Sequence, residues 1–137
     1  MKTAKDLMTS PAECLAPDET IVTAARMLRK YDVGSMPILD GDTLVGVVTD
    51  RDIVINAVAK GLDVATATVA EAASDTVVTV DVEDSAEQVA QVLGEHQIRR
   101  VPVVENGKVV GVISQADVAR DLDNATAGEV VEEISKD

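Results

Sequence analysis

Apolar residues fall at helical spacing in some segments and in short β-branched runs in others, and these two patterns alternate along the chain. The patterns predict the secondary structure. Two segments carry apolar residues at helical spacing (i, i+3, i+4, i+7) and predict amphipathic helices. They are Ile21, Ala24, Ala25 and Leu28, and Ala86, Val89, Ala90 and Leu93. Each segment is followed by two short β-branched runs, over residues 36–39 with 44–48 and over residues 101–104 with 109–113. Gly41 divides the first pair and Asn106-Gly107 the second, so each pair is predicted to form a β-hairpin.

Polar residues mark where further helices begin. Thr3 with Asp6 and Thr68 with Glu71 form Thr-x-x-acid boxes. Such boxes predict a helix N-cap, and therefore a short helical turn near the start of each half of the chain. A brief extended piece is expected after each turn, around Cys14-Leu15 and around residues 78–80.

A last helix in each half is predicted to begin directly after the hairpin, at Thr49 or at Ser114. The inner faces of these helices are expected to carry Ile53, Ala57 and Val58 in the first half and Val118 and Leu122 in the second. A third box, from Thr126 to Glu129, predicts a closing C-terminal helix.

The same order of elements is found twice, because the chain aligns with itself without a gap from Thr3/Thr68 to Asp52/Asp117. The segment from Gly46 to Asp52 returns as the segment from Gly111 to Asp117, so one strand-helix-strand-strand-helix unit was built twice. The predicted fold class is α/β (α+β), with repeat 1 at residues 1–65, repeat 2 at residues 66–125 and a helical tail at residues 126–137. Each repeat is small for a core of its own, so the two are expected to pack on each other.

Composition narrows the class of protein. The 137 residues carry a formal net charge of −13, which disfavours nucleic acid as a partner because binding to phosphates requires clustered Lys and Arg. Apolar residues make up 46% of the chain and supply a core, yet no apolar run approaches the roughly 18 residues that span a bilayer. The N-terminus also lacks an apolar signal region. These features predict a soluble cytoplasmic protein that binds no membrane.

Histidine and cysteine, which often carry catalysis or hold metals, are scarce, and the many carboxylates alone are not an active site. With one cysteine (Cys14) and one histidine (His96), the sequence offers no metal cluster and no nucleophile paired with a base. It also lacks the Gly-x-x-x-x-Gly-Lys phosphate loop. We therefore expect a non-enzyme that requires no metal, and we interpret Cys14 as a buried, inert thiol.

Together, the paired apolar-x-Pro-apolar runs at Pro37 and Pro102 and the two Gly-apolar-apolar-[Ser/Thr]-x-x-Asp segments resemble a cystathionine-β-synthase (CBS) domain pair, of the stand-alone type found in actinobacteria. The resemblance covers about residues 5 to 123. It implies two repeats packed with pseudo-twofold symmetry, a homodimer, and a regulatory module that acts on an unidentified protein in trans. It further implies adenine nucleotides (AMP, ADP or ATP) bound in clefts between the repeats, with S-adenosylmethionine and NAD as lesser alternatives.

Carried over residue by residue, the resemblance implies that Asp52 and Asp117 contact the ribose hydroxyls, and that Thr49 and Ser114 lie near the ribose and phosphate. A carboxylate accepts hydrogen bonds from both vicinal hydroxyls of a ribose, which agrees with this assignment. Apolar strand residues, Met36 and Val101 among them, are candidates to wall in an adenine.

Two alternatives stay open at this point. Arg99 and Arg100 align with Gly34 and Ser35, so the two sites are unequal, and the arginines either bind phosphate or pair with the abundant carboxylates. The [Ser/Thr]-x-x-Asp motifs also cap helices in the absence of any ligand, which would make the chain a ligand-free structural or interaction module.

Overall fold

The computed structural model describes residues 2–74 and 77–121, which form two compact units. One unit consists of residues 13–77 and the other of residues 1–12 together with residues 78–137. Helices and short strands alternate in both units, which confirms the mixed α/β class expected from the sequence.

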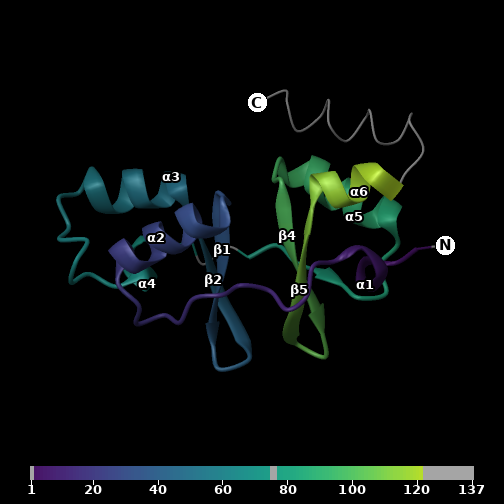
Figure 1. Cartoon of the computed structure of the whole chain (residues 1–137), viewed down its shortest axis with the longest axis horizontal. Helices are drawn as coiled ribbons and strands as arrows, with labels where there is room; N and C mark the ends of the chain where they lie inside the picture. Colours follow the sequence, from purple (N-terminus) through teal and green to yellow (C-terminus); the bar gives the residue numbers. More distant parts are fainter. Residues whose placement is uncertain (1, 75–76, 122–137) are drawn as a thin grey trace. The chain divides into compact units, whose positions relative to one another are not determined.

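The unit of residues 13–77 is built around one antiparallel hairpin. Strands β1 (Ser35–Asp40) and β2 (Thr43–Thr49) form it, and Leu15 makes a parallel bridge to Ile38 of β1. The helical segments lie to one side of this hairpin (Figure 1). They are α2 (Ile21–Tyr31), α3 (Asp50–Asp52), the π-helix η1 (Ile53–Val58) and α4 (Val69–Ala72).

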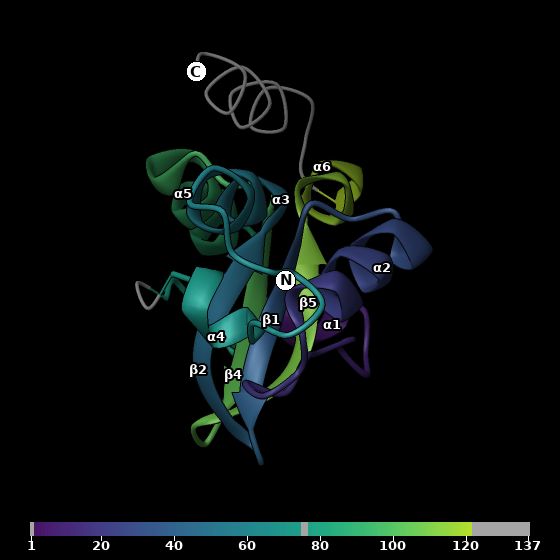
Figure 2. The same cartoon turned by 90° about the vertical axis from the view of Figure 1, so that its left-hand side faces the viewer.

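The second unit repeats this plan. Strand β4 (Arg100–Glu105) pairs antiparallel with β5 (Lys108–Ser114) and parallel with β3 (Val80–Asp81). Its helices are α1 (Ala4–Leu7), α5 (Ala86–His96) and α6 (Gln115–Asp121). The turns of both hairpins extend beyond the helices of their own unit (Figure 2). Asn106 and Gly107 both have positive φ, of 52° and 80°, as the Asn-Gly hairpin signal requires.

Each unit has its own apolar core, and most of the predicted inner-face residues are in it. Ala86, Val89, Ala90 and Leu93 of α5 are all buried, as are Ile21, Ala24 and Leu28 of α2. Burial of a side chain such as Leu93 stabilises the fold by about 1.5–3 kcal/mol. Ala25 is exposed, because the buried face of α2 is narrower than the sequence pattern suggested.

The helix after β2 departs from the prediction. Ala57 is fully buried and Ile53 partly buried, but Val58 is 62% exposed. Residues Ile53–Val58 form a π-helix, whose i→i+5 bonds widen the turn and change which residues share a face, so the expected α-helical period fails here. In the second unit Val118 is buried as expected, while Leu122 and the box at Thr126–Glu129 lie outside the described residues.

The short first helix of each sequence repeat packs with the other repeat's elements. In the unit containing α5, Ala4 of α1 donates its amide to the carbonyl of Asp84 at 2.8 Å. In the other unit, Val69 of α4 donates to the carbonyl of Glu19 at 2.7 Å. The compact units therefore differ from the sequence repeats by a reciprocal exchange of these helices. Across the described ranges, no helix has the length and apolar character needed to cross a bilayer.

Candidate functional site

The first [Ser/Thr]-x-x-Asp motif lies where β2 passes into α3. The amide of Asp52 donates to Oγ1 of Thr49 at 2.9 Å, and the amide of Thr49 donates to Oδ2 of Asp52 at 3.0 Å. This reciprocal pair is a capping box. Within the part of the chain that the structure describes, no hydrogen bond or ion pair reaches Oδ1 of Asp52. One carboxylate oxygen therefore caps the helix, and the other keeps its full capacity to accept hydrogen bonds.

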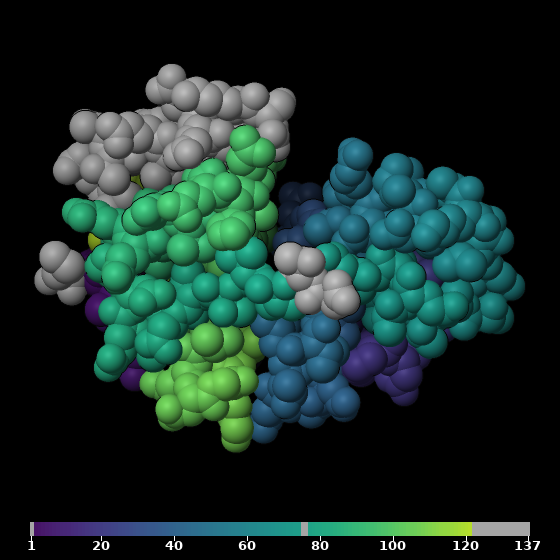
Figure 3. All heavy atoms as spheres, turned by 180° about the vertical axis from the view of Figure 1, so that it is seen from behind, coloured from purple at the N-terminus to yellow at the C-terminus, as the bar shows by residue number. Residues whose placement is uncertain are grey.

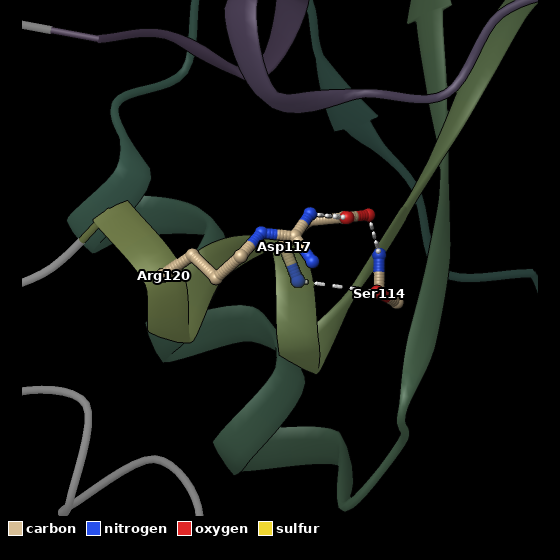
Figure 4. Close-up of polar contacts among 3 residues, drawn as sticks. All are labelled: Ser114, Asp117 and Arg120. Carbon is tan, nitrogen blue, oxygen red and sulfur yellow. Dashed lines mark hydrogen bonds and ion pairs between the residues drawn. The ribbon is translucent and has the colours of Figure 1, made fainter.

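The second motif has the same cap, at the passage from β5 to α6. The amide of Asp117 donates to Oγ of Ser114 at 3.2 Å, and the amide of Ser114 donates to Oδ2 of Asp117 at 2.9 Å. Here the second oxygen also has a partner, because Nη2 of Arg120 donates to Oδ1 of Asp117 at 2.5 Å (Figure 4). The two motifs thus share the same capping box, but they differ in whether the second carboxylate oxygen has a partner.

Capping by itself is common in this fold. Thr3 with Asp6, Thr68 with Glu71 and Ser85 with Gln88 form the same reciprocal box at the starts of α1, α4 and α5. At the first of these, hydrogen bonds from the amide and hydroxyl of Thr3 hold the pKa of the Asp6 carboxyl below its usual value. The box therefore marks helix starts in general, and Asp6 and Glu71 also use only one carboxylate oxygen in it. Asp52 differs from these two because its box directly follows a hairpin strand and is partly buried, whereas theirs are exposed.

The structure brings Arg99 and Arg100 beside the second motif. Arg100 is the register partner of Ser114 in the β4–β5 ladder, and the carbonyl of Arg99 accepts from the amide of Gln115 at 2.8 Å. Both arginines are exposed. Gly34 and Ser35 take the matching places beside Thr49, where Ser35 is its register partner. The two motifs therefore differ in nearby positive charge, as the alignment predicted.

The two apolar candidates lie in the cores. Met36 is 2% exposed and Val101 is fully buried, each packed within the core of its own unit. Because a buried side chain presents no surface, these two side chains stabilise the fold and leave only backbone atoms at their positions for a ligand. An adenine wall made from them would require the core to open.

Two polar groups beside the second motif were missed by the sequence analysis. Arg120 follows Asp117 by three residues, and opposite charges at i, i+3 on a helix are a signal that could have identified the pair. Gln115 was also overlooked; its Oε1 atom is buried and accepts no hydrogen bond from the residues that the structure describes. Buried acceptors are almost always satisfied in folded proteins, so this atom has capacity for a donor from a ligand or from water.

Two hairpin repeats, each continued by a [Ser/Thr]-x-x-Asp cap, define a tandem CBS module, and the chain belongs to the CBS-domain family. The family model for the CBS domain matches residues 4–58 and 69–124. Among individual relatives, Hypoxic response protein 1 of Mycobacterium tuberculosis is 45% identical over 123 residues, which cover 89% of this chain and 86% of that protein.

Solved structures agree with this assignment. The crystal structure of Hypoxic Response Protein I superposes with a TM-score of 0.81 at 43% identity, covering 88% of this chain and 99% of that one. CBSX2, solved in complex with AMP, superposes with a TM-score of 0.77 at 27% identity, covering 88% of this chain and 95% of that one. The CBS domain pair of MJ0100 was solved with 5′-methylthioadenosine and S-adenosyl-L-methionine. It superposes with a TM-score of 0.75 at 29% identity, covering 88% of this chain and 94% of that one.

The crystal structure of Hypoxic Response Protein I contains two coordinated zinc ions. This chain has a single cysteine and a single histidine. Over residues 2–74 and 77–121, no group of three or more His, Cys, Asp or Glu side chains is arranged to hold a metal ion. The described residues do not fit a zinc site, so no chemistry is assigned to one.

Proposed function

We propose that this CBS-domain chain is a non-catalytic regulatory module that binds adenosine-containing nucleotides of the AMP, ADP and ATP class at its [Ser/Thr]-x-x-Asp motifs. The observation that carries the proposal is the partly buried Asp52 carboxylate at the junction of β2 and α3. It caps α3 through Oδ2, and among the described residues Oδ1 has no hydrogen bond or ion pair. Hydrogen bonds to a charged acceptor are roughly twice as strong as neutral ones, so this oxygen is suited to a ribose hydroxyl.

Two further observations support the same class of ligand. CBS proteins of similar structure have been solved with AMP and with 5′-methylthioadenosine and S-adenosyl-L-methionine, which share an adenosine moiety. Arg99 and Arg100 at the second motif offer guanidinium groups, which bind phosphate in a bidentate manner. A catalytic role has no comparable support, since the chain has one histidine, one cysteine and no phosphate loop.

A ligand-free module is the second candidate, and a specific observation favours it. Both aspartates already serve as helix caps, with amide-to-Oδ2 distances of 3.0 and 2.9 Å. On this account the motifs would stabilise the two units and leave regulation to protein contacts. The two candidates differ in what happens when the charge of the aspartate is removed and the cap is kept.

Asp52→Asn makes that distinction, because an asparagine side-chain oxygen still accepts from the Thr49 amide. Ligand binding through the carboxylate predicts that this change lowers affinity for AMP by about tenfold or more, the value of a charged hydrogen bond, and leaves the melting temperature of the ligand-free protein nearly unchanged. Ser85→Ala is the matched control: it removes the same kind of cap at the start of α5, outside both motifs, and should cost about 1 kcal/mol of stability without changing affinity.

Isothermal titration calorimetry supplies the affinity and thermal denaturation supplies the stability. Titration with 2′-deoxyadenosine monophosphate adds a test of the ribose contact, since that ligand lacks one hydroxyl and should bind more weakly than AMP. If Asp52→Asn and Asp117→Asn, alone and combined, both leave AMP affinity unchanged, the motifs are caps only and the second candidate stands.

We also propose that the protein is a homodimer that acts on another protein in trans. The support is an apolar face of η1 formed by Val54 and Val58, which are 56% and 62% exposed. The outer surface of this segment, coloured blue to teal, is visible in Figure 3. Apolar side chains so open to water are the kind of surface that a second copy would cover.

A further inference from the structure

The difference between the two aspartates comes from the residue three positions after each of them. Arg120 of α6 aligns with Ile55 of η1, at the same distance after the motif aspartate. Arg120 pairs with Asp117, whereas an isoleucine cannot pair with Asp52. No ion pair joins Arg51 to Asp52 either, within residues 2–74 and 77–121. In the ligand-free protein, Asp117 is therefore paired with an arginine, whereas Asp52 has no cationic partner among the described residues.

The Asp117–Arg120 pair is arranged so that it can open. The Asp117 side chain is only 14% exposed, while the Arg120 side chain, which extends along α6 to the carboxylate (Figure 4), is 73% exposed. Because most of the Arg120 side chain is in water, it can exchange one anionic partner for another without leaving solvent. A guanidinium has five N–H donors, and the ion pair engages Nη2, so other donors are available to a second anion.

We propose that Arg120 makes the second motif selective for adenosine ligands that carry a phosphate, and that the first motif, with Ile55 at this position, lacks this selectivity. A neutral nucleoside at Asp117 must compete with the guanidinium for Oδ1 and offers it nothing in return. A phosphorylated ligand supplies an anion that draws Arg120 away from Asp117 while the ribose hydroxyls take its place. The inference rests on the proposed function and adds to it a ligand class for each motif.

Local charge agrees with this division. Arg99 and Arg100 lie beside Ser114 in the ladder, so the second motif has two arginines next to it in addition to Arg120. The first motif has Gly34 and Ser35 in those places, and a second acidic residue, Asp50, precedes Arg51. The chain carries a net charge of −13, which disfavours a phosphate, and nearby arginines lower that repulsion at the second motif.

The test compares AMP with adenosine in proteins that keep one intact motif each. In the Asp52→Asn protein, which keeps the second motif, AMP is expected to bind about tenfold or more tightly than adenosine by calorimetry. Adding Arg120→Ile should lower this ratio toward that of the Asp117→Asn protein, which keeps the first motif; Arg99 and Arg100, which remain, account for any difference left. Arg26→Ile, at an exposed arginine of α2, controls for the loss of one positive charge.

A transfer of selectivity provides the second arm. Ile55 is 48% exposed, so Ile55→Arg is expected to fold, and in the Asp117→Asn background it should raise the ratio of AMP to adenosine affinity. Binding with a ratio that Arg120→Ile leaves unchanged would overturn this inference and leave the proposed function standing. Failure of the unaltered protein to bind either ligand would refute the proposed function and this inference with it.

Discussion

Each motif aspartate has two carboxylate oxygens, and these two oxygens differ in their partners. Oδ2 closes a capping box in both motifs, whereas Oδ1 is unpaired in Asp52 and bound to Arg120 in Asp117. The sequence located both motifs and both adjacent arginines. It could not show which oxygen is committed, because that depends on side-chain geometry at each helix start.

Cys14 gives a residue-level prediction about reactivity. Its side chain is partly buried, less completely than the sequence interpretation expected. Burial, together with the negative charge of Glu13, raises the pKa of the thiol. Since the thiolate is the reactive form, alkylation of the folded protein by iodoacetamide near pH 7.5 should be slower than that of the unfolded chain. The rate should keep rising at pH values where the unfolded chain has levelled off; equal rates in the two states would contradict this.

At the scale of elements, the packing of β5 depends on a glycine. The segment before Cys14 lies against this strand, with the Thr9 amide donating to the Val112 carbonyl at 2.9 Å. A Cβ built on Gly111 would lie 2.6 Å from Sδ of Met8 and 2.9 Å from the carbonyl oxygen of Thr9. We expect Gly111→Ala to lower the free energy of unfolding by about 1–3 kcal/mol, the usual cost of overpacking.

Gly34→Ala is the matched control for that change. A Cβ built on Gly34 would have its nearest neighbour in Oδ2 of Asp50, at 3.4 Å, which is an ordinary van der Waals distance. This variant should be neutral or stabilised by about 0.4–1 kcal/mol through the entropy of the unfolded chain. Urea denaturation of the ligand-free proteins compares the two, and equal stabilities for both variants would refute the close packing of Gly111.

The elements predicted best are those with strong local signals. Both hairpins follow from β-branched runs around Gly41 and Asn106-Gly107, and α5 follows from its four apolar positions. The π-helix at Ile53–Val58 was not predictable in this way, because a sequence period of 3.6 carries no sign of a widened turn. Exposure of Val58 is the consequence.

At the scale of the whole molecule, compact units and sequence repeats do not coincide. The family model follows the repeats, at residues 4–58 and 69–124, whereas the first helix of each repeat packs in the unit formed mainly by the other. Internal similarity reveals a duplication but carries no information about such an exchange, since α1 and α4 have equivalent capping boxes. Neither unit is therefore a continuous piece of one repeat.

The proposed homodimer is tested at this scale too. We expect the protein to elute with twice the 14.4 kDa mass of one chain in size-exclusion chromatography with light scattering. Val54→Glu with Val58→Glu should yield a monomer with little loss of stability, because both side chains are mainly exposed. Val45→Glu, at a 42% exposed valine of β2, is the control for added charge. A dimer that tolerates the double change would exclude the η1 face.

The central claim is that carboxylates committed to helix capping through one oxygen also bind an adenosine ligand through the other. Calorimetric titration of the unaltered protein and of the Asp52→Asn, Asp117→Asn double variant with AMP tests it most directly. We predict saturable binding by the unaltered protein, with about 2.7 kcal/mol of added stability at a hundredfold excess over the dissociation constant. The double variant should keep its ligand-free melting temperature and lose binding. No binding by the unaltered protein, or equal binding by both, would contradict the account.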